Sequence, residues 1–200
     1  MSELSQAKIL GGVGSLLMLL SFVPTVGGLL GIVGFVLVLI AVKYVSDVVG
    51  DRAIFNNMLI SVILGIVGIV VGLVVGVISF FTVFGRVVGM PSDFSEWFGP
   101  SQVSPESIVG LLIGVILGLV VIWVFYIISA IFLRKSFTAI SSRLNVKLFG
   151  TAALLYLIGA ALLIVLVGFV ILLVALILQT IAFFSIPETP PQQTTISQPM

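Results

Sequence analysis

The sequence contains no cysteine and no histidine among its 200 residues. Without cysteine there can be no disulfide, no thiolate nucleophile and no iron–sulfur ligation. Without histidine the chain lacks the commonest metal ligand and the usual proton shuttle near neutral pH. The remaining residues show no nucleophile–base pair and no metal-ligand spacing. We therefore expect no catalytic residue, no metal and no cofactor, and we do not expect an enzyme.

Charge is also scarce, because only 8% of the residues are charged while 60% are hydrophobic. A soluble domain carries about 25% charged residues. A chain this apolar cannot cover its own surface with polar groups, so lipid has to solvate most of it. The composition predicts an all-α, polytopic transmembrane helical bundle with the lipid bilayer as its partner and no nucleic-acid partner.

Five apolar segments predict five spans, at about 6–23, 26–49, 54–88, 106–133 and 148–184. The first, with Lys8 upstream, would also suit a signal peptide, but no A-x-A site follows and we expect an uncleaved span. The last is too short for two spans and a turn, so we expect one tilted helix. The spans form a domain over 1–185, and the polar tail 186–200 should be disordered.

Two junctions carry helix-end signals. Gly50 stands where a helix C-terminus favours glycine, and Asp51 can cap the helix that follows. Further along, Ser104-Pro105-Glu106 combines a capping residue, a proline suited to the first helical position and an acid in the first turn. We expect a tight hairpin at the first junction and a helix start at the second.

Lysine and arginine set the expected orientation. With the N-terminus inside, the outer segments hold only Arg86, and seven cations lie inside: Lys8, Lys43, Arg52, Arg134, Lys135, Arg143 and Lys147. This asymmetry favours a cytoplasmic N-terminus in the cell membrane. An odd number of spans then puts the C-terminus on the extracytoplasmic side.

Glycine recurs every fourth residue in two of the segments, as Gly68, Gly72 and Gly76 and as Gly110, Gly114 and Gly118. In lipid, helices associate by close backbone packing, and small residues at this spacing permit it. Shorter patterns occur as Ala7-x3-Gly11-x3-Ser15 and Gly27-x3-Gly31. The ridges predict helix–helix contacts, either within one bundle or between copies of the chain. The likeness of the two full ridges also fits a duplication or chance.

Polar residues are few within the spans. We expect the serines at 15, 21, 61, 79 and 129 to bond to their own helix backbone. The richest polar cluster is Lys43, Asp47, Asn56 and Asn57, with Tyr44, Asp51 and Arg52 nearby. Lys43 and Asp47 can pair four residues apart. The asparagines could bridge helices or form a small polar site.

Two loops combine polar and apolar residues. In the inner one, Phe137, Ile140, Leu144 and Leu148 recur at helical spacing beside Arg134, Lys135, Arg143 and Lys147. This pattern fits a basic amphipathic helix on lipid headgroups, or an ordinary inner loop. In the outer one, Phe94, Trp97 and Phe98 fit a headgroup anchor or a docking patch.

The stretches SQAKILGGVGSLL, GFVLVLIAVKYVSD and DRAIFNNMLISVILGIVG resemble an uncharacterised, largely archaeal family of multi-pass membrane proteins, domain of unknown function 996. The resemblance covers about residues 4–180 and is strongest in the first 70. It implies an archaeal-type plasma membrane protein with about this number of spans. It implies no activity and no functional residues.

The sequence favours a non-catalytic membrane component, either a homo-oligomer or a small subunit of a larger membrane complex. The alternative is a channel or facilitator for a small neutral or weakly polar solute. A transporter normally has ionisable residues in mid-membrane. The central stretches of these segments contain none.

Overall fold

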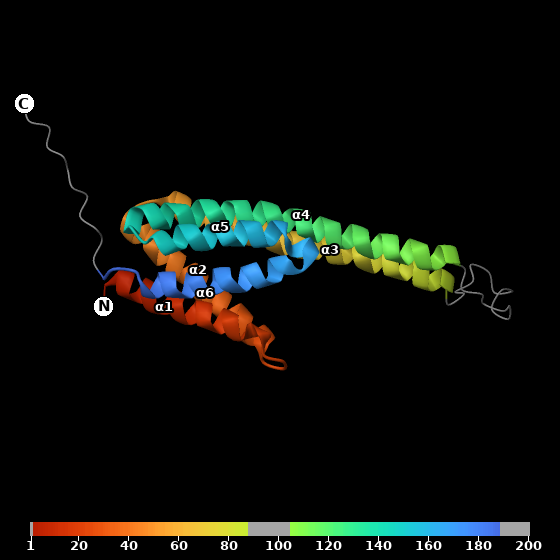
Figure 1. The fold of residues 1–200 in the computed structure, drawn as a ribbon, viewed down its shortest axis with the longest axis horizontal. Coiled ribbons are helices and arrows are strands. Elements are labelled where there is room, and N and C mark those ends of the chain that lie inside the picture. Colours follow the sequence, from red (N-terminus) through yellow and green to blue (C-terminus); the bar gives the residue numbers. More distant parts are fainter. Residues whose placement is uncertain (1, 88–104, 189–200) are drawn as a thin grey trace, which may run out of the picture. The chain divides into compact units, whose positions relative to one another are not determined.

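The computed structural model describes residues 2–87 and 105–188 and shows six α-helices there without a strand. They are α1 (Glu3–Leu19), α2 (Gly27–Val49), α3 (Arg52–Val87), α4 (Pro105–Leu144), α5 (Lys147–Ala161) and α6 (Val167–Phe184). Short 3₁₀ turns, η1 (Leu20–Phe22) and η3 (Leu163–Val165), follow α1 and α5 (Figure 1). The predicted all-helical class is confirmed.

Four of these helices are long and apolar enough to cross a membrane. They are Gly27–Val49, Arg52–Phe81, Leu112–Leu144 and Val167–Phe184. The chain divides into two compact units, one formed by Met1–Val62 with Ser129–Met200 and the other by Ile63–Ile128. The first holds α1, α2, α5 and α6 with the ends of α3 and α4, and the second holds the remaining parts of α3 and α4.

The helix ends in the first unit follow the signals in the sequence. Gly50 takes a left-handed conformation, with φ of 70°, at the end of α2. Its missing side chain makes this conformation inexpensive, so the chain reverses within two residues. The backbone N–H of Ala53 donates to Asp51 Oδ1 over 3.1 Å, which caps the first turn of α3. Both predictions at this junction are confirmed, as is the start of α4 at Pro105.

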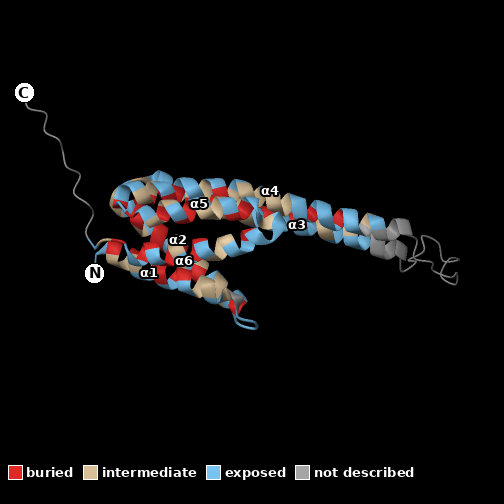
Figure 2. Ribbon diagram, in the orientation of Figure 1, coloured by how far each residue is buried: buried red, intermediate tan, exposed pale blue. Residues whose placement is uncertain are grey.

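The core of the first unit lies where six helix ends meet. It takes side chains from the start of α1, the end of α2, the start of α3, the end of α4, the start of α5 and the end of α6. Phe149 and Phe183 pack edge to face with ring centroids 5.0 Å apart, and Phe137 lies beside both. Figure 2 shows buried positions along α1, α2 and α6 in this unit.

The expected single helix over 148–184 is wrong, because the chain breaks after Ala161 and reverses. Leu166 takes a left-handed φ of 61° before α6 begins. The turn is possible because Gly159 and Gly168 let the two backbones touch. A Cβ at Gly168 would collide with the Gly159 carbonyl oxygen and the Leu163 nitrogen. With neither proline nor a polar residue at the turn, the sequence had no ordinary break signal.

The two ends of the described chain lie side by side. Ser2 Oγ donates a hydrogen bond to the backbone oxygen of Glu188 over 3.0 Å. Ile186 is only 1% exposed, so packing continues past the expected boundary at residue 185. Residues 2 and 188 therefore lie next to each other, which bears on the side of the membrane where each end stands. The rest of the predicted tail lies outside the described residues, as do Phe94, Trp97 and Phe98.

Candidate functional site

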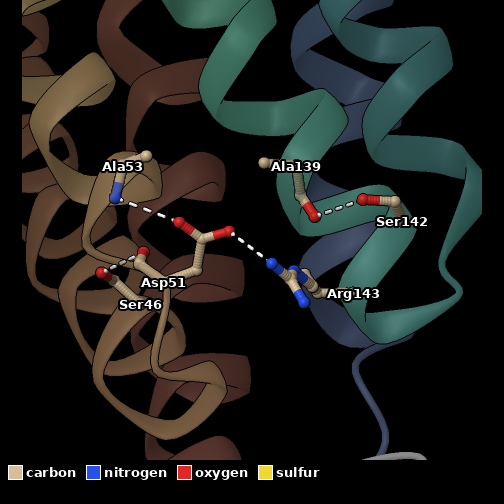
Figure 3. A network of polar contacts seen from close by, with 6 residues as sticks. All are labelled: Ser46, Asp51, Ala53, Ala139, Ser142 and Arg143. Atoms are coloured by element: carbon tan, nitrogen blue, oxygen red, sulfur yellow. Dashed lines mark hydrogen bonds and ion pairs between the residues drawn. The ribbon is translucent and has the colours of Figure 1, made fainter. Parts of the chain in front are cut away.

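Asp51 organises the polar groups at the turn between α2 and α3 (Figure 3). One carboxylate oxygen caps α3, and the other accepts from Arg143 Nη2 on α4 over 3.1 Å. Ser46 Oγ donates to the backbone oxygen of Asp51 over 2.9 Å. The Arg143 and Asp51 side chains are 46% and 22% exposed, so water screens this pair and its contribution to stability is at most about 1 kcal/mol. The network connects the turn between α2 and α3 to the end of α4.

The predicted polar cluster at 43–57 does not converge on a site. Lys43, Asp47 and Asn56 are exposed and Asn57 is half-buried. No bond among these four is recorded within the described residues, including the expected Lys43–Asp47 pair. Within the part of the chain that the structure describes, the two asparagines make no side-chain hydrogen bond to another helix.

A buried hydrogen-bond chain instead joins three helices of the first unit. Tyr156 Oη on α5 donates to Gln179 Oε1 on α6 over 2.7 Å, and Gln179 Nε2 donates to Ser15 Oγ on α1 over 2.8 Å. Ser15 is fully buried and Gln179 is 3% exposed. Such bonds between membrane helices contribute about 0.6–2 kcal/mol each. The chain fixes α5 and α6 against α1.

Sequence reasoning missed Tyr156 and Gln179 because it looked for ionisable groups. A signal was available, since Gln179 is the one glutamine between 148 and 184. A carboxamide in so apolar a stretch indicates a polar partner on another helix. Ser15 was expected to bond to its own helix, and its bond to Gln179 shows otherwise.

Two serine contacts join α3 to α4 in the same unit. Ser61 and Ser129 hydroxyls lie 3.0 Å apart, and Ser129 Oγ also donates to the Ser61 carbonyl over 2.8 Å. About two turns further along α4, Ser136 Oγ donates to the Ile54 carbonyl over 2.8 Å. The backbone-bonding prediction holds for Ser79, which donates to Val75, and fails for Ser61 and Ser129.

The glycine ridges lie between α3 and α4 in the second unit. A Cβ at Gly68 would collide with Phe125, one at Gly72 with Ile122, and one at Gly114 with Ser79. Gly118 would place its Cβ 3.0 Å from the Gly72 oxygen. These glycines pack the two helices of one chain against each other.

Two ridge glycines are placed differently. A Cβ at Gly76 would meet nothing within 4 Å, and Gly110 is half-buried. Gly76 lines an open apolar groove of about 240 Å³ on the α3–α4 pair, together with Gly72, Leu73, Val77, Phe80, Val115, Gly118, Leu119 and Ile122. We call this the α3–α4 groove.

The predicted amphipathic helix is the end of α4, and its apolar face points into the core. Phe137 and Ile140 are fully buried and Leu144 is 2% exposed, so this face cannot lie on a membrane surface. The predicted headgroup residues Arg134, Lys135, Arg143 and Lys147 are all exposed. Lys135 Nζ lies 4.9 Å from the centre of the Phe132 ring.

The described residues contain neither a cluster of metal ligands nor an unpaired buried polar side chain. No group of three or more Asp or Glu side chains gathers among them in a way that could hold a metal ion. Every buried side-chain nitrogen or oxygen in 2–87 and 105–188 has a hydrogen-bond partner. The Ser15–Gln179–Tyr156 chain and the serine contacts of α3 with α4 are bonds of this kind that connect helices.

This fold defines an all-helical membrane protein in which several buried polar side chains bond to neighbouring helices. The family model described as a protein of unknown function, DUF996, matches residues 30–177. An uncharacterised protein of Methanocaldococcus jannaschii is 36% identical over 189 residues, which cover 93% of this chain and 94% of that protein. The chain belongs to the DUF996 family. No solved structure matches it.

Proposed function

We propose that the protein is a non-catalytic integral membrane protein that acts as a structural or assembly component, as a homo-oligomer or within a larger membrane complex. The observation that carries this proposal is that no buried side-chain nitrogen or oxygen in the described residues lacks a hydrogen-bond partner. The Ser15–Gln179–Tyr156 chain and the serine contacts of α3 with α4 use these groups inside the protomer.

The same observation argues against a polar conduit within one protomer. A path for ions or polar solutes needs groups that replace hydration along its whole length. Here the hydroxyls and the carboxamide bond to one another, and the surroundings are valine, isoleucine and leucine. An enzyme is disfavoured on related grounds, because no buried side-chain nitrogen or oxygen of the described residues is left without a hydrogen-bond partner.

The α3–α4 groove is the surface through which we propose that copies associate. Gly76 leaves space there that no side chain of the protomer fills. Glycine at this spacing admits a close-packed helix in lipid. Leu73 lines the groove and is 56% exposed. A second copy that seated a helix here would bury Leu73 and fill the groove.

Oxidative crosslinking in native membranes tests the association. The chain has no cysteine, so single-cysteine variants report on one position. Leu73→Cys should form disulfide-linked dimers in high yield. Val71→Cys is the matched control, because it is exposed, does not line the groove and lies about 160° around the helix from Leu73. Equal yields at both positions would contradict this surface.

We also expect no ion current from the pure protein in liposomes. A reproducible conductance that is abolished by Gly72→Leu would overturn the structural role.

We further propose that both described ends of the chain lie on the cytoplasmic side of the cell membrane. Seven of the eight lysines and arginines fall in the first unit, close to the helix ends that form its core. Cations favour the cytoplasmic side. Because Ser2 bonds to Glu188, residue 188 must lie on that same side.

Labelling with a membrane-impermeant maleimide in intact cells checks this orientation. Glu188→Cys should be protected, like the inner reference Ser142→Cys, and should react only after permeabilisation. Ser95→Cys, between α3 and α4 in the sequence, should react directly from outside. Direct labelling of Glu188→Cys would restore the odd-span topology and contradict the Ser2–Glu188 contact.

A further inference from the structure

Within the first unit, α5 and α6 form an antiparallel hairpin and contact each other at its base, its middle and its tip. At its base Phe149 and Phe183 pack edge to face, and halfway along Tyr156 donates to Gln179. Near the tip the backbones of Gly159 and Gly168 touch. Figure 1 shows α5, coloured from teal to light blue, and α6, in blue, joined by a turn. The hairpin is therefore a firm antiparallel pair with one free end, its tip.

The tip exposes large apolar side chains and no polar ones. Ile164, Val165 and Val167 are 63%, 61% and 56% exposed, and Leu166 is 80% exposed. From residue 157 to residue 178 the chain has no charged and no hydrogen-bonding side chain. A tip that reached a membrane–water interface would be expected to carry polar groups, or the tryptophan and tyrosine that anchor there.

Four backbone N–H groups at the tip donate to carbonyl oxygens within the turn. Within the turn, Val165 N donates to Leu162 O, Leu166 N to Leu163 O, and Gly168 N to Leu162 O. Phe169 N then donates to Leu166 O. Backbone groups exposed to hydrocarbon must be satisfied within the protein, whereas a turn in water can leave them to the solvent.

The residue at the turn supports a lipid environment. Leu166 adopts the left-handed conformation, which glycine and asparagine take at lower energy. In water neither this conformation nor an exposed leucine side chain would be favoured. In hydrocarbon a leucine side chain is favoured over a polar one. A tip that lies in hydrocarbon therefore explains why position 166 is leucine.

The hairpin is also too shallow for two crossings. The Tyr156 ring lies 6.4 Å from the Phe137 ring of α4. Phe137 is about one helical turn along α4 from Arg134, whose side chain is exposed. A charge of this kind marks the edge of the hydrocarbon, because it is costly inside. Only five residues of α5 follow Tyr156, about 8 Å of helix, whereas the hydrocarbon core is about 30 Å thick.

We propose that α5–α6 is a re-entrant hairpin that enters and leaves the membrane on the basic side, and that its tip at 162–167 contacts the lipid acyl chains of that leaflet. By length and composition α6 could cross the membrane. In this proposal it instead leads the chain from the tip back to the side on which α5 entered. The inference rests on the membrane location proposed above and is independent of association through the α3–α4 groove.

Spin labels on single cysteines test the depth of the tip in liposomes. Leu166→Cys and Ile164→Cys replace exposed side chains, so the fold should tolerate both. We expect high collision rates with oxygen and low rates with a water-soluble nickel chelate at both positions. Glu188→Cys, at the base, should show the opposite pattern. The same three variants, unlabelled, should then be treated with an impermeant maleimide from each side of sealed vesicles.

The result that supports the proposal is no maleimide reaction of Leu166→Cys from either side, with Glu188→Cys reactive from one. Reaction of Leu166→Cys from the side opposite to Glu188→Cys would show two full crossings and overturn it. Reaction from the same side would place the hairpin on the surface and overturn it equally. Neither outcome bears on the disulfide yields at Leu73 and Val71, so the two proposals fail separately.

Discussion

Replacing Gly34 by alanine lowers the stability of the protein, while the same change at Gly28 on the same helix leaves it unchanged or raises it. A Cβ at Gly34 would collide with the Gly14 carbonyl oxygen of α1 and lie 2.8 Å from the Met18 nitrogen. These are backbone atoms and cannot turn aside. A Cβ at Gly28 would meet nothing within 4 Å.

Helix propensity alone predicts the opposite result at Gly34. Alanine is favoured over glycine inside a helix by about 1 kcal/mol, so Gly28→Ala should gain up to that amount. Overpacking at a tight contact costs about 1–3 kcal/mol, which exceeds the gain. Unfolding of both variants by SDS in mixed micelles measures the difference. Two variants of equal stability would mean that α1 and α2 do not pack through Gly14 and Gly34.

The glycines illustrate how far periodic spacing can be read. It correctly indicates that glycine faces in α3 and α4 are contact surfaces, because backbone proximity requires small residues wherever it occurs. It does not say which glycine contacts what. Gly76 has the same spacing as Gly72 but faces open space, while Gly14 and Gly34 bring two backbones into contact outside any regular ridge. That difference depends on how helices cross, which one segment does not encode.

The helix break after Ala161 could not be predicted from the sequence, because it too depends on a contact between helices. A helix interruption is read from proline, from polar residues or from capping groups, and the stretch 157–178 has none of these. The turn depends on a contact between Gly159 and Gly168 that exists only once α6 has folded back. Hydropathy alone therefore joins two helices, α5 and α6, into one.

The end of α4 shows that amphipathic spacing identifies a buried face without identifying what covers it. Phe137 and Ile140 recur at helical spacing beside four cations, a pattern shared by a membrane-surface helix and by a helix packed on a core. In the structure the core covers this face. Phe137 contacts the rings of Phe149, Tyr156 and Phe183, which reach it from α5 and α6.

Phe137→Ala separates these two interpretations with the largest single-residue effect that we expect. Phe137 is fully buried, so truncation leaves a cavity among three aromatic rings and should lower the free energy of unfolding by about 3–5 kcal/mol. Phe81→Ala is the matched control, because Phe81 is 64% exposed and should change stability by only about 0.5 kcal/mol.

The measurement is again unfolding by SDS in mixed micelles, with vesicle binding as a second reading. A core residue predicts that Phe137→Ala unfolds at much lower SDS while its folded fraction stays in the membrane like the wild type. A surface helix predicts near-wild-type stability with weakened attachment of the Arg134–Lys147 segment to anionic lipid. If Phe137→Ala and Phe81→Ala unfold together, the six helix ends do not share a core. The placement of α5 and α6 beside α4, on which the re-entrant hairpin depends, would then be wrong as well.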